Sequence, residues 1–88
     1  MTRRPEKVAE LAVRSLADGE VVVLRPDGSA ALVLNGTGAA VLELCDGRHS
    51  VVEMATLIAS VFPEVPREAV EADVDALVAQ LTDAGCLR

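Results

Sequence analysis

The sequence predicts an α+β fold with a winged-helix-like arrangement, in which a three-stranded antiparallel β-meander is followed by three α-helices. Short β-branched runs bounded by Asp-Gly and Pro-Asp-Gly turns occupy the first third of the chain. Amphipathic patterns with helix-start and helix-stop signals occupy the remainder. Because 88 residues leave room for a single hydrophobic core, residues 1–88 are expected to form one domain.

The sheet is expected over about residues 9–34. Its strands are predicted at Ala9–Leu16, Glu20–Arg25 and Ala30–Leu34. The middle segment contains three consecutive valines, and β-branched residues are enriched in strands. The first segment fits a helix or a strand, and the Asp18-Gly19 turn that follows it favours the strand of a hairpin. Pro26-Asp27-Gly28 predicts a second turn, and the polar residues 1–6 are expected to fray.

The helices are expected at about residues 37–45, 50–62 and 66–84. Either Asn35 or Thr37 is suited to cap the first helix. Ser50 and Glu53 have the spacing of a capping box at the start of the second helix. Pro66 is suited to be the first residue of the third helix, because proline lacks the N–H that is unpaired at that position.

Apolar residues at helical spacing predict the core that covers one face of the sheet. They are Val41, Leu42, Leu44 and Cys45, then Met54, Leu57, Ile58 and Val61, then Val70, Val74, Leu77, Val78 and Leu81. A strip of small and polar residues runs beside the last stripe: Ala69, Asp73, Ala76, Gln80 and Ala84. The small residues of this strip either let the helix lie close to the sheet or leave room for a ligand.

The charge balance argues against nucleic acid as a partner. Acidic residues outnumber Lys and Arg by 14 to 8, which gives a net charge of −6, whereas nucleic-acid binding depends on basic side chains. Five acidic residues lie between Glu64 and Asp75, where they either complement the start of a helix or recognise a partner. The sequence has no apolar run long enough for a membrane helix and no signal peptide, so the cytoplasm is the expected compartment.

No arrangement of residues predicts an enzyme, a metal site or a cofactor. Cys45 and Cys86 lack metal-ligand spacing, and Cys45 is expected to be a small buried hydrophobe. His49 is expected to be an exposed turn residue. Gly36 and Gly38 precede a helix, but the sequence lacks the lysine and the full glycine pattern of a phosphate-binding loop.

The order and spacing of several segments resemble the PqqD family over about residues 9–88. The segments are Leu-Asn-Gly-Thr-Gly-Ala-Ala-Val-Leu-Glu-Leu-Cys-Asp-Gly at 34–47, Ser-Val-Val-Glu-Met-Ala at 50–55, Glu-Ala-Asp-Val at 71–74, and Gly-Cys-Leu at 85–87. The chain departs from the family pattern at Ala31, where a bulky residue is frequent.

The resemblance implies a domain that binds the leader segment of a ribosomally made precursor peptide and presents it to a modifying enzyme, often a radical S-adenosylmethionine protein. It also implies that the leader adds as a strand to the third strand and lies against the third helix. The residues expected to contact it are Ala30, Ala31, Leu32, Val33, Leu34, Asp73, Ala76, Leu77, Gln80 and Leu81.

Three alternatives remain open from the sequence. They are a DNA-binding winged helix, leader recognition of the lasso-peptide type with a protease partner, and a subunit that only stabilises a partner enzyme. A homodimer or strand exchange is also compatible with the exposed strand edges.

Overall fold

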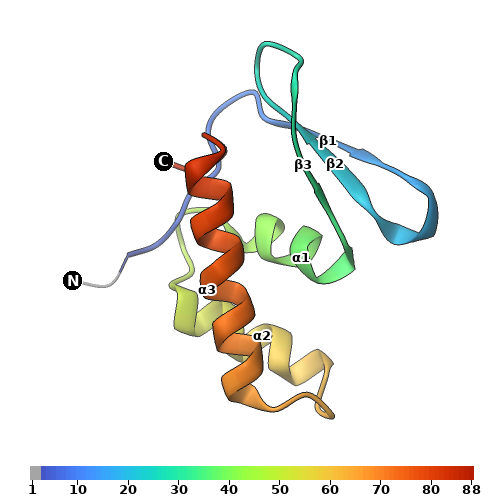
Figure 1. The fold of residues 1–88 in the computed structure, drawn as a ribbon. Helices are drawn as coiled ribbons and strands as arrows, with labels where there is room; N and C mark the ends of the chain where they lie inside the picture. Colours follow the sequence, from blue (N-terminus) through green and yellow to red (C-terminus); the bar gives the residue numbers. More distant parts are fainter. Residues whose placement is uncertain (1–2) are drawn as a thin grey trace.

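The computed structural model describes residues 3–88, which form one antiparallel sheet followed by helices (Figure 1). The strands are β1 (Ala12–Ser15), β2 (Val21–Leu24) and β3 (Ala30–Leu34), and the helices are α1 (Gly36–Leu44), α2 (Val51–Val61) and α3 (Arg67–Asp83). A short 3₁₀ turn, Ala17–Gly19, joins β1 to β2. The predicted α+β class and the order of three strands and three helices are confirmed.

The sheet has the strand order β1-β2-β3, so β1 and β3 are its two edges. Asp18 and Gly19 have φ angles of 63° and 78°, the left-handed conformation that tight hairpin turns require. β1 is shorter than the predicted strand at Ala9–Leu16, because Glu10 has a φ of 69° and a strand cannot continue through that conformation.

The second hairpin turn is held by two backbone–backbone hydrogen bonds and by the side chain of Asp27. Gly28 N donates to Arg25 O at 2.8 Å, and Arg25 N donates to Ser29 O at 2.9 Å. Gly28 has a φ of 88°, which completes a three-residue loop with a bulge. The Asp27 carboxylate accepts from the Ser29 hydroxyl and N–H, and these bonds hold the pKa of Asp27 below its usual value.

The helix starts follow the predicted caps with one correction. Asn35 rather than Thr37 caps α1, because its Oδ1 accepts from Gly38 N at 2.9 Å. Ser50 and Glu53 form the predicted capping box at the start of α2. Pro66 lies outside α3 instead of being its first residue, since its ψ of 139° is extended.

The core lies between the inner face of the sheet and the three helices. Its apolar members are Val23, Leu34, Val41, Leu42, Cys45, Met54, Ala55, Ile58, Val70, Val74, Val78, Leu81, Cys86 and Leu87. The predicted burial of Leu57 and Val61 is wrong, since they are 44% and 68% exposed. α2 packs mainly against α3 and also against α1, and the face that carries Leu57 and Val61 is left uncovered.

The approach of α1 to β3 depends on a glycine. Gly38 is buried, and a Cβ at that position would lie 3.0 Å from Leu34 Cβ and 3.2 Å from Leu34 Cδ2. These distances are shorter than normal carbon–carbon contacts. Gly38 therefore allows the start of α1 to cover the end of β3.

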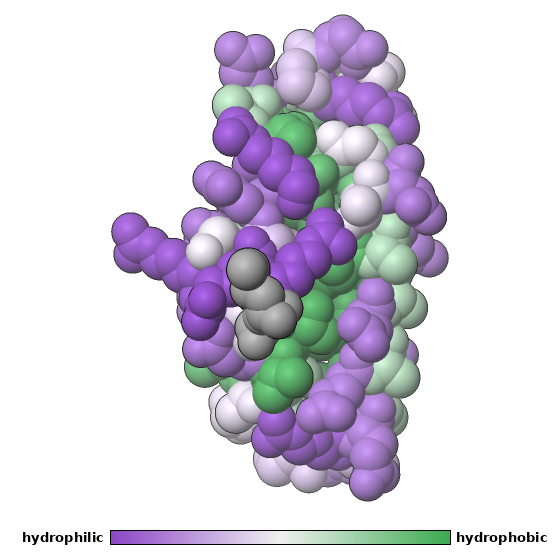
Figure 2. Space-filling model, turned by 90° about the vertical axis from the view of Figure 1, so that its left-hand side faces the viewer, coloured by the Kyte–Doolittle hydropathy of each residue, from purple (hydrophilic) through white to green (hydrophobic). Residues whose placement is uncertain are grey.

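The N-terminal segment is held in place, which corrects the expectation that residues 1–6 fray; residues 1–2 lie outside the described residues. Pro5 is buried, and its carbonyl accepts from Gly47 N at 2.9 Å. Lys7 N donates to Cys45 O at 2.9 Å, and Arg88 N donates to Glu6 O at 2.9 Å. Figure 2 views the molecule from the side on which this segment runs and shows an apolar strip between hydrophilic margins.

Two titratable residues that follow α1, Cys45 and His49, differ in their surroundings. Cys45 is completely buried, as predicted, and burial raises the pKa of its thiol to about 11. His49 is not the exposed residue that was predicted: its side chain is 27% exposed, and its Nδ1 lies 3.0 Å from Asp46 Oδ1. Across residues 3–88, no three His, Cys, Asp or Glu residues are grouped to hold a metal, and no helix is long and apolar enough to span a membrane.

Candidate functional site

The outer edge of β3 presents unpaired backbone groups. Leu16 N donates to Glu20 O at 2.7 Å, and antiparallel pairs alternate between bonded and non-bonded positions. Arg14 and Val22 form the pair two positions further along the register. They are therefore a bonded pair, and the N–H and C=O of Val22 bond to β1. Val33 is opposite Val22 on β3, so its N–H and C=O point away from the sheet toward the open edge.

The side chains of β3 do nothing to block this edge. Residues Ala30–Leu34 carry no charge, and Val33 is 57% exposed. Exposed edges in natural proteins are usually protected by charged residues or proline, because they otherwise pair with another strand. An uncharged, unpaired edge therefore indicates a place where an extended chain can add to the sheet.

A polar hollow of about 340 Å³ lies next to the end of β3. It is lined by Asn35, Thr37, Asp73, Ala76, Leu77 and Gln80. Four of these, on α3, are predicted site residues that the fold brings together. Asn35 and Thr37 were predicted only as helix caps, because nothing in their spacing indicates that α3 lies opposite them.

An apolar hollow of about 120 Å³ adjoins the polar hollow. Its lining comes from all three helices and the α2–α3 connection: Thr37, Ile58, Phe62, Val65, Val70, Asp73 and Val74. Thr37 and Asp73 line both hollows, so they form the boundary between the polar and apolar spaces.

Asp73 is the charged group of this site, and its charge is not compensated by a basic neighbour. Among the ion pairs of residues 3–88, Glu71 lies 3.1 Å from Arg67, and Glu53 lies 3.9 Å from Arg4, but none includes Asp73. No Lys or Arg lines either hollow. The boundary of the two hollows is therefore a place of net negative charge.

Arg25 closes the space between β3 and α3 at its other end. Its Nε donates to Ala84 O at 3.1 Å, and its Nη1 donates to Ala30 O at 3.0 Å. One guanidinium thus joins the C-terminal end of α3 to the first residue of β3. No pattern in the sequence indicates this role of Arg25, because it depends on a contact between residues 59 positions apart.

The other predicted site residues lie beneath or beside the groove, by which we mean the β3 edge together with the polar and apolar hollows. Leu34 and Leu81 are buried, at 4% and 0% exposure, and belong to the core under the groove. Ala31 and Leu32 are half-buried and pack against that core. The small strip on α3 has two uses: Ala84 packs against the core, whereas Ala76 is exposed and lines the polar hollow.

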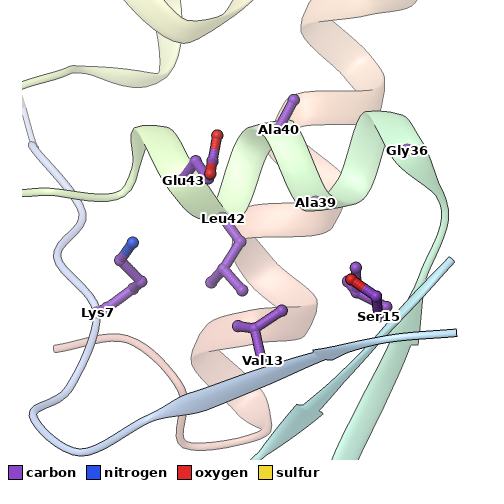
Figure 3. A pocket seen from close by; sticks show the side chains of 9 residues that line it. Lys7, Val13, Ser15, Gly36, Ala39, Ala40, Leu42 and Glu43 are labelled. Atoms are coloured by element: carbon purple, nitrogen blue, oxygen red, sulfur yellow. The ribbon is translucent and has the colours of Figure 1, made fainter. Parts of the chain in front are cut away.

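A larger hollow, of about 470 Å³, lies toward the β1 edge of the sheet, between β1, β2 and α1 (Figure 3). Val13 of β1 and Leu42 of α1 point toward one another within it. Lys7 and Glu43 line the same hollow, so its lining carries both signs of charge. We call it the β1-side hollow.

The groove is suited to binding an extended chain. Backbone pairing with β3 supplies affinity for any extended segment, and the hollows select its side chains.

Comparison with known proteins places these features in a family. The family model described as "Coenzyme PQQ synthesis protein D (PqqD)" matches residues 20–87. A PqqA binding protein of Gluconobacter oxydans (strain 621H) is 35% identical over 97 residues, covering 99% of this chain and 98% of the relative.

Two solved structures are similar in fold over nearly the whole chain. A lasso peptide synthetase B1 complexed with the leader peptide has a TM-score of 0.75 and 31% identity, and covers 97% of this chain and 98% of its own. The PqqD truncation of Methylobacterium extorquens PqqCD, described as a stand-alone recognition element for ribosomally synthesised and modified peptides, has a TM-score of 0.75 and 25% identity. It covers 96% of this chain and 87% of its own.

Proposed function

This chain belongs to the PqqD family, and from that premise we propose that it binds the leader segment of a precursor peptide and presents it to a modifying enzyme. The alignments with the two relatives whose names mention a peptide span nearly the full length of this chain and of each relative. The similarity therefore includes the β3 edge and α3.

The observation that carries the proposal is the uncharged, unpaired edge of β3 beside the two hollows. Val33 directs its N–H and C=O outward, and a peptide strand would satisfy both groups. The side chains of such a strand would lie against Asp73, Ala76, Leu77 and Gln80. The ten residues expected from the sequence divide into the edge, the hollow lining and the core beneath them.

The partner enzyme belongs to the finer part of the proposal. A radical S-adenosylmethionine enzyme is our first candidate. The Gluconobacter oxydans relative is named a PqqA binding protein, and the matching family model concerns coenzyme PQQ synthesis. A lasso-peptide pathway with a protease partner is the second candidate, supported by the 31% identity to a lasso peptide synthetase B1. A cytoplasmic location follows from either candidate, since the precursor is made on ribosomes.

Calorimetric titration of the chain tests the proposal directly. The ligands are the precursor peptide encoded beside this gene and PqqA of Gluconobacter oxydans, the peptide named for the relative. We expect saturable binding of at least one of them with a negative heat-capacity change, because the groove buries apolar surface. If neither peptide binds, the proposed function is wrong.

A DNA-binding role is the alternative that the charge distribution disfavours. The helix that would read DNA in a winged helix is α3, and its first half carries Glu68, Glu71, Asp73 and Asp75. We expect no shift of a DNA duplex by micromolar protein at physiological salt. A shift that weakens steeply with added salt would instead support DNA binding.

We also propose that the chain itself has no catalytic activity and needs no metal or cofactor. Two of the relatives named above are described as a PqqA binding protein and as a recognition element, and neither description mentions a reaction. Stoichiometric zinc or iron in protein washed with chelator would contradict this part of the proposal.

A further inference from the structure

We propose that the groove selects a leader in which a Lys or Arg side chain lies two positions from an apolar side chain. This inference rests on the proposed leader binding and adds the class of sequence that the site accepts. The basic side chain would occupy the polar hollow beside Asp73, and the apolar side chain would occupy the adjacent hollow lined by Phe62 and Val70.

The charge of the two hollows favours a basic side chain in the ligand. Asp73 lies at the boundary of both hollows and has no ion-pair partner among residues 3–88, and neither lining contains a basic residue. The side chains of Asn35, Thr37 and Gln80 add oxygen acceptors around the same space. An ammonium or guanidinium group supplies donors to these acceptors and balances the carboxylate, whereas an acidic side chain would be repelled.

The spacing of the two hollows along α3 matches alternate side chains of an extended peptide. The apolar hollow takes Val70, Asp73 and Val74 from this helix, and the polar hollow takes residues from Asp73 to Gln80. The two sets are displaced by about one helical turn, or roughly 5–6 Å. Side chains two positions apart on a strand point the same way and are roughly 6.6–6.8 Å apart. An extended peptide therefore places alternate side chains in the two hollows.

The polar hollow is continuous with the β3 edge. Asn35 and Thr37 follow β3 directly in the chain and line the polar hollow. A strand that pairs with Val33 reaches the polar hollow first and the apolar hollow beyond it. An added antiparallel strand would therefore carry its apolar residue before its basic residue, and a parallel strand would reverse that order.

Selection from an mRNA-displayed library of random 15-residue peptides tests this inference with the full chain as bait. The variants are Asp73→Lys and Asp75→Lys, which change the net charge equally. Asp75 is the matched control because it lies on α3 but lines a different hollow, with Arg3, Thr82 and Asp83. Circular dichroism checks that each variant keeps the helical signal of the parent chain.

We expect the parent chain to enrich Lys or Arg two positions from an aliphatic or aromatic residue, in either order. Asp73→Lys should lose the basic preference and gain Asp or Glu, while Asp75→Lys should keep the parent motif. In titrations of the best selected peptide, replacing its basic residue with Gln should weaken binding by about two- to fivefold, as for an exposed ion pair. The same change in the peptide should not alter its affinity for the Asp73→Asn variant.

The outcomes separate this inference from the function on which it rests. Enriched peptides without a basic residue, or a motif unchanged by Asp73→Lys, overturn the inference and leave peptide binding intact. An equal loss of preference in Asp75→Lys also overturns it, since net charge would then explain the effect. If the parent chain enriches no peptide, the proposed function itself fails.

Discussion

The two edges of the sheet offer the same backbone chemistry but differ in the side chains around it. Counting from the same hairpin bond, Val13 on β1 and Val33 on β3 both point their N–H and C=O groups outward. The β1 edge carries Arg14 and adjoins a hollow lined by Lys7 and Glu43. The β3 edge carries no charge and adjoins the polar hollow, in which Asp73 is the acidic residue.

This difference teaches that open hydrogen-bonding groups do not by themselves identify a binding edge. A charged side chain on an edge strand, and a backbone that turns away, both discourage pairing with another chain. β1 has both features, because Arg14 lies within it and the positive φ of Glu10 ends its straight course. β3 has an uncharged surface over five residues, so it is the edge we expect a peptide to use.

The sharpest way to break the comparison is to remove one outward donor from each edge. Val33→Pro deletes an N–H at the open edge of β3 without removing a bond to β2. We expect it to weaken leader binding by more than about tenfold, or about 1.4 kcal/mol, measured by calorimetry. Val13→Pro makes the matching change on β1 and should leave binding within about twofold of the parent chain, well under that 1.4 kcal/mol threshold.

Circular dichroism must show that both proline variants keep the parent's helical signal. Loss of binding in Val13→Pro with normal binding in Val33→Pro would move the peptide to the β1 edge. Normal binding in both would exclude strand addition at either edge.

The hollows beside the two edges can be filled in the same way. Ala76→Trp places a large side chain in the polar hollow, and we expect leader affinity to fall by about tenfold, or about 1.4 kcal/mol. Ala39→Trp fills part of the β1-side hollow and should leave affinity unchanged. Ala79→Trp is a control on α3 itself, since Ala79 is exposed and lines a hollow on the other face of that helix. Equal losses in Ala76→Trp and Ala79→Trp would argue against a specific groove.

The seating of α1 on β3 is tested by stability rather than binding. Gly38→Ala forces a methyl group against Leu34, an overpacking that costs about 1–3 kcal/mol, partly offset by a gain of about 1 kcal/mol in helix propensity. We expect a net loss of about 1 kcal/mol in the free energy of unfolding, measured by urea denaturation with an unchanged m-value.

Gly36→Ala is the matched control, because nothing lies within 4 Å of a Cβ at that position. It should stabilise the chain slightly through helix propensity. If Gly38→Ala is also stabilising, the close approach of α1 to β3 does not limit the packing.

The smallest effect is expected at Arg25, which joins the two sides of the groove. Arg25→Lys keeps the charge but cannot donate to Ala84 O and Ala30 O in the same geometry. We expect the free energy of unfolding to fall by about 0.5 kcal/mol, the low end for hydrogen bonds, because these bonds are partly exposed. Arg14→Lys on the β1 edge is the control and should have no effect on unfolding; equal losses would assign the effect to lysine substitution in general.

Local signals in the sequence were sufficient for the elements of the fold. The valine run of β2, the Asp18-Gly19 turn and the Ser50–Glu53 capping box each act over a few residues, and the structure has all three. The two errors at strand and helix ends, near Glu10 and Pro66, depend on backbone angles that neither residue type dictates.

The site required information that periodicity does not contain. The helical spacing of residues on α3 predicted Asp73, Ala76, Leu77 and Gln80 as neighbours, and the structure places them in one hollow. What faces them is set by tertiary packing, so Thr37 and Arg25 could not be assigned from the sequence. The prediction that Leu57 and Val61 are buried failed for the same reason, because the sequence does not show which face of α2 is left uncovered.

The hydrogen bonds that hold the N-terminal segment have a consequence for how the domain can be joined to other proteins. Glu6 and Val8 bond to Arg88 and Cys86, so the N-terminal segment and the C-terminus lie together, away from the end of β3 and the start of α1 (Figure 1). A polypeptide fused to either end would leave the groove accessible. A short flexible fusion to a modifying enzyme would raise the local concentration of captured leader to the millimolar range, which lets a weakly held peptide saturate the enzyme.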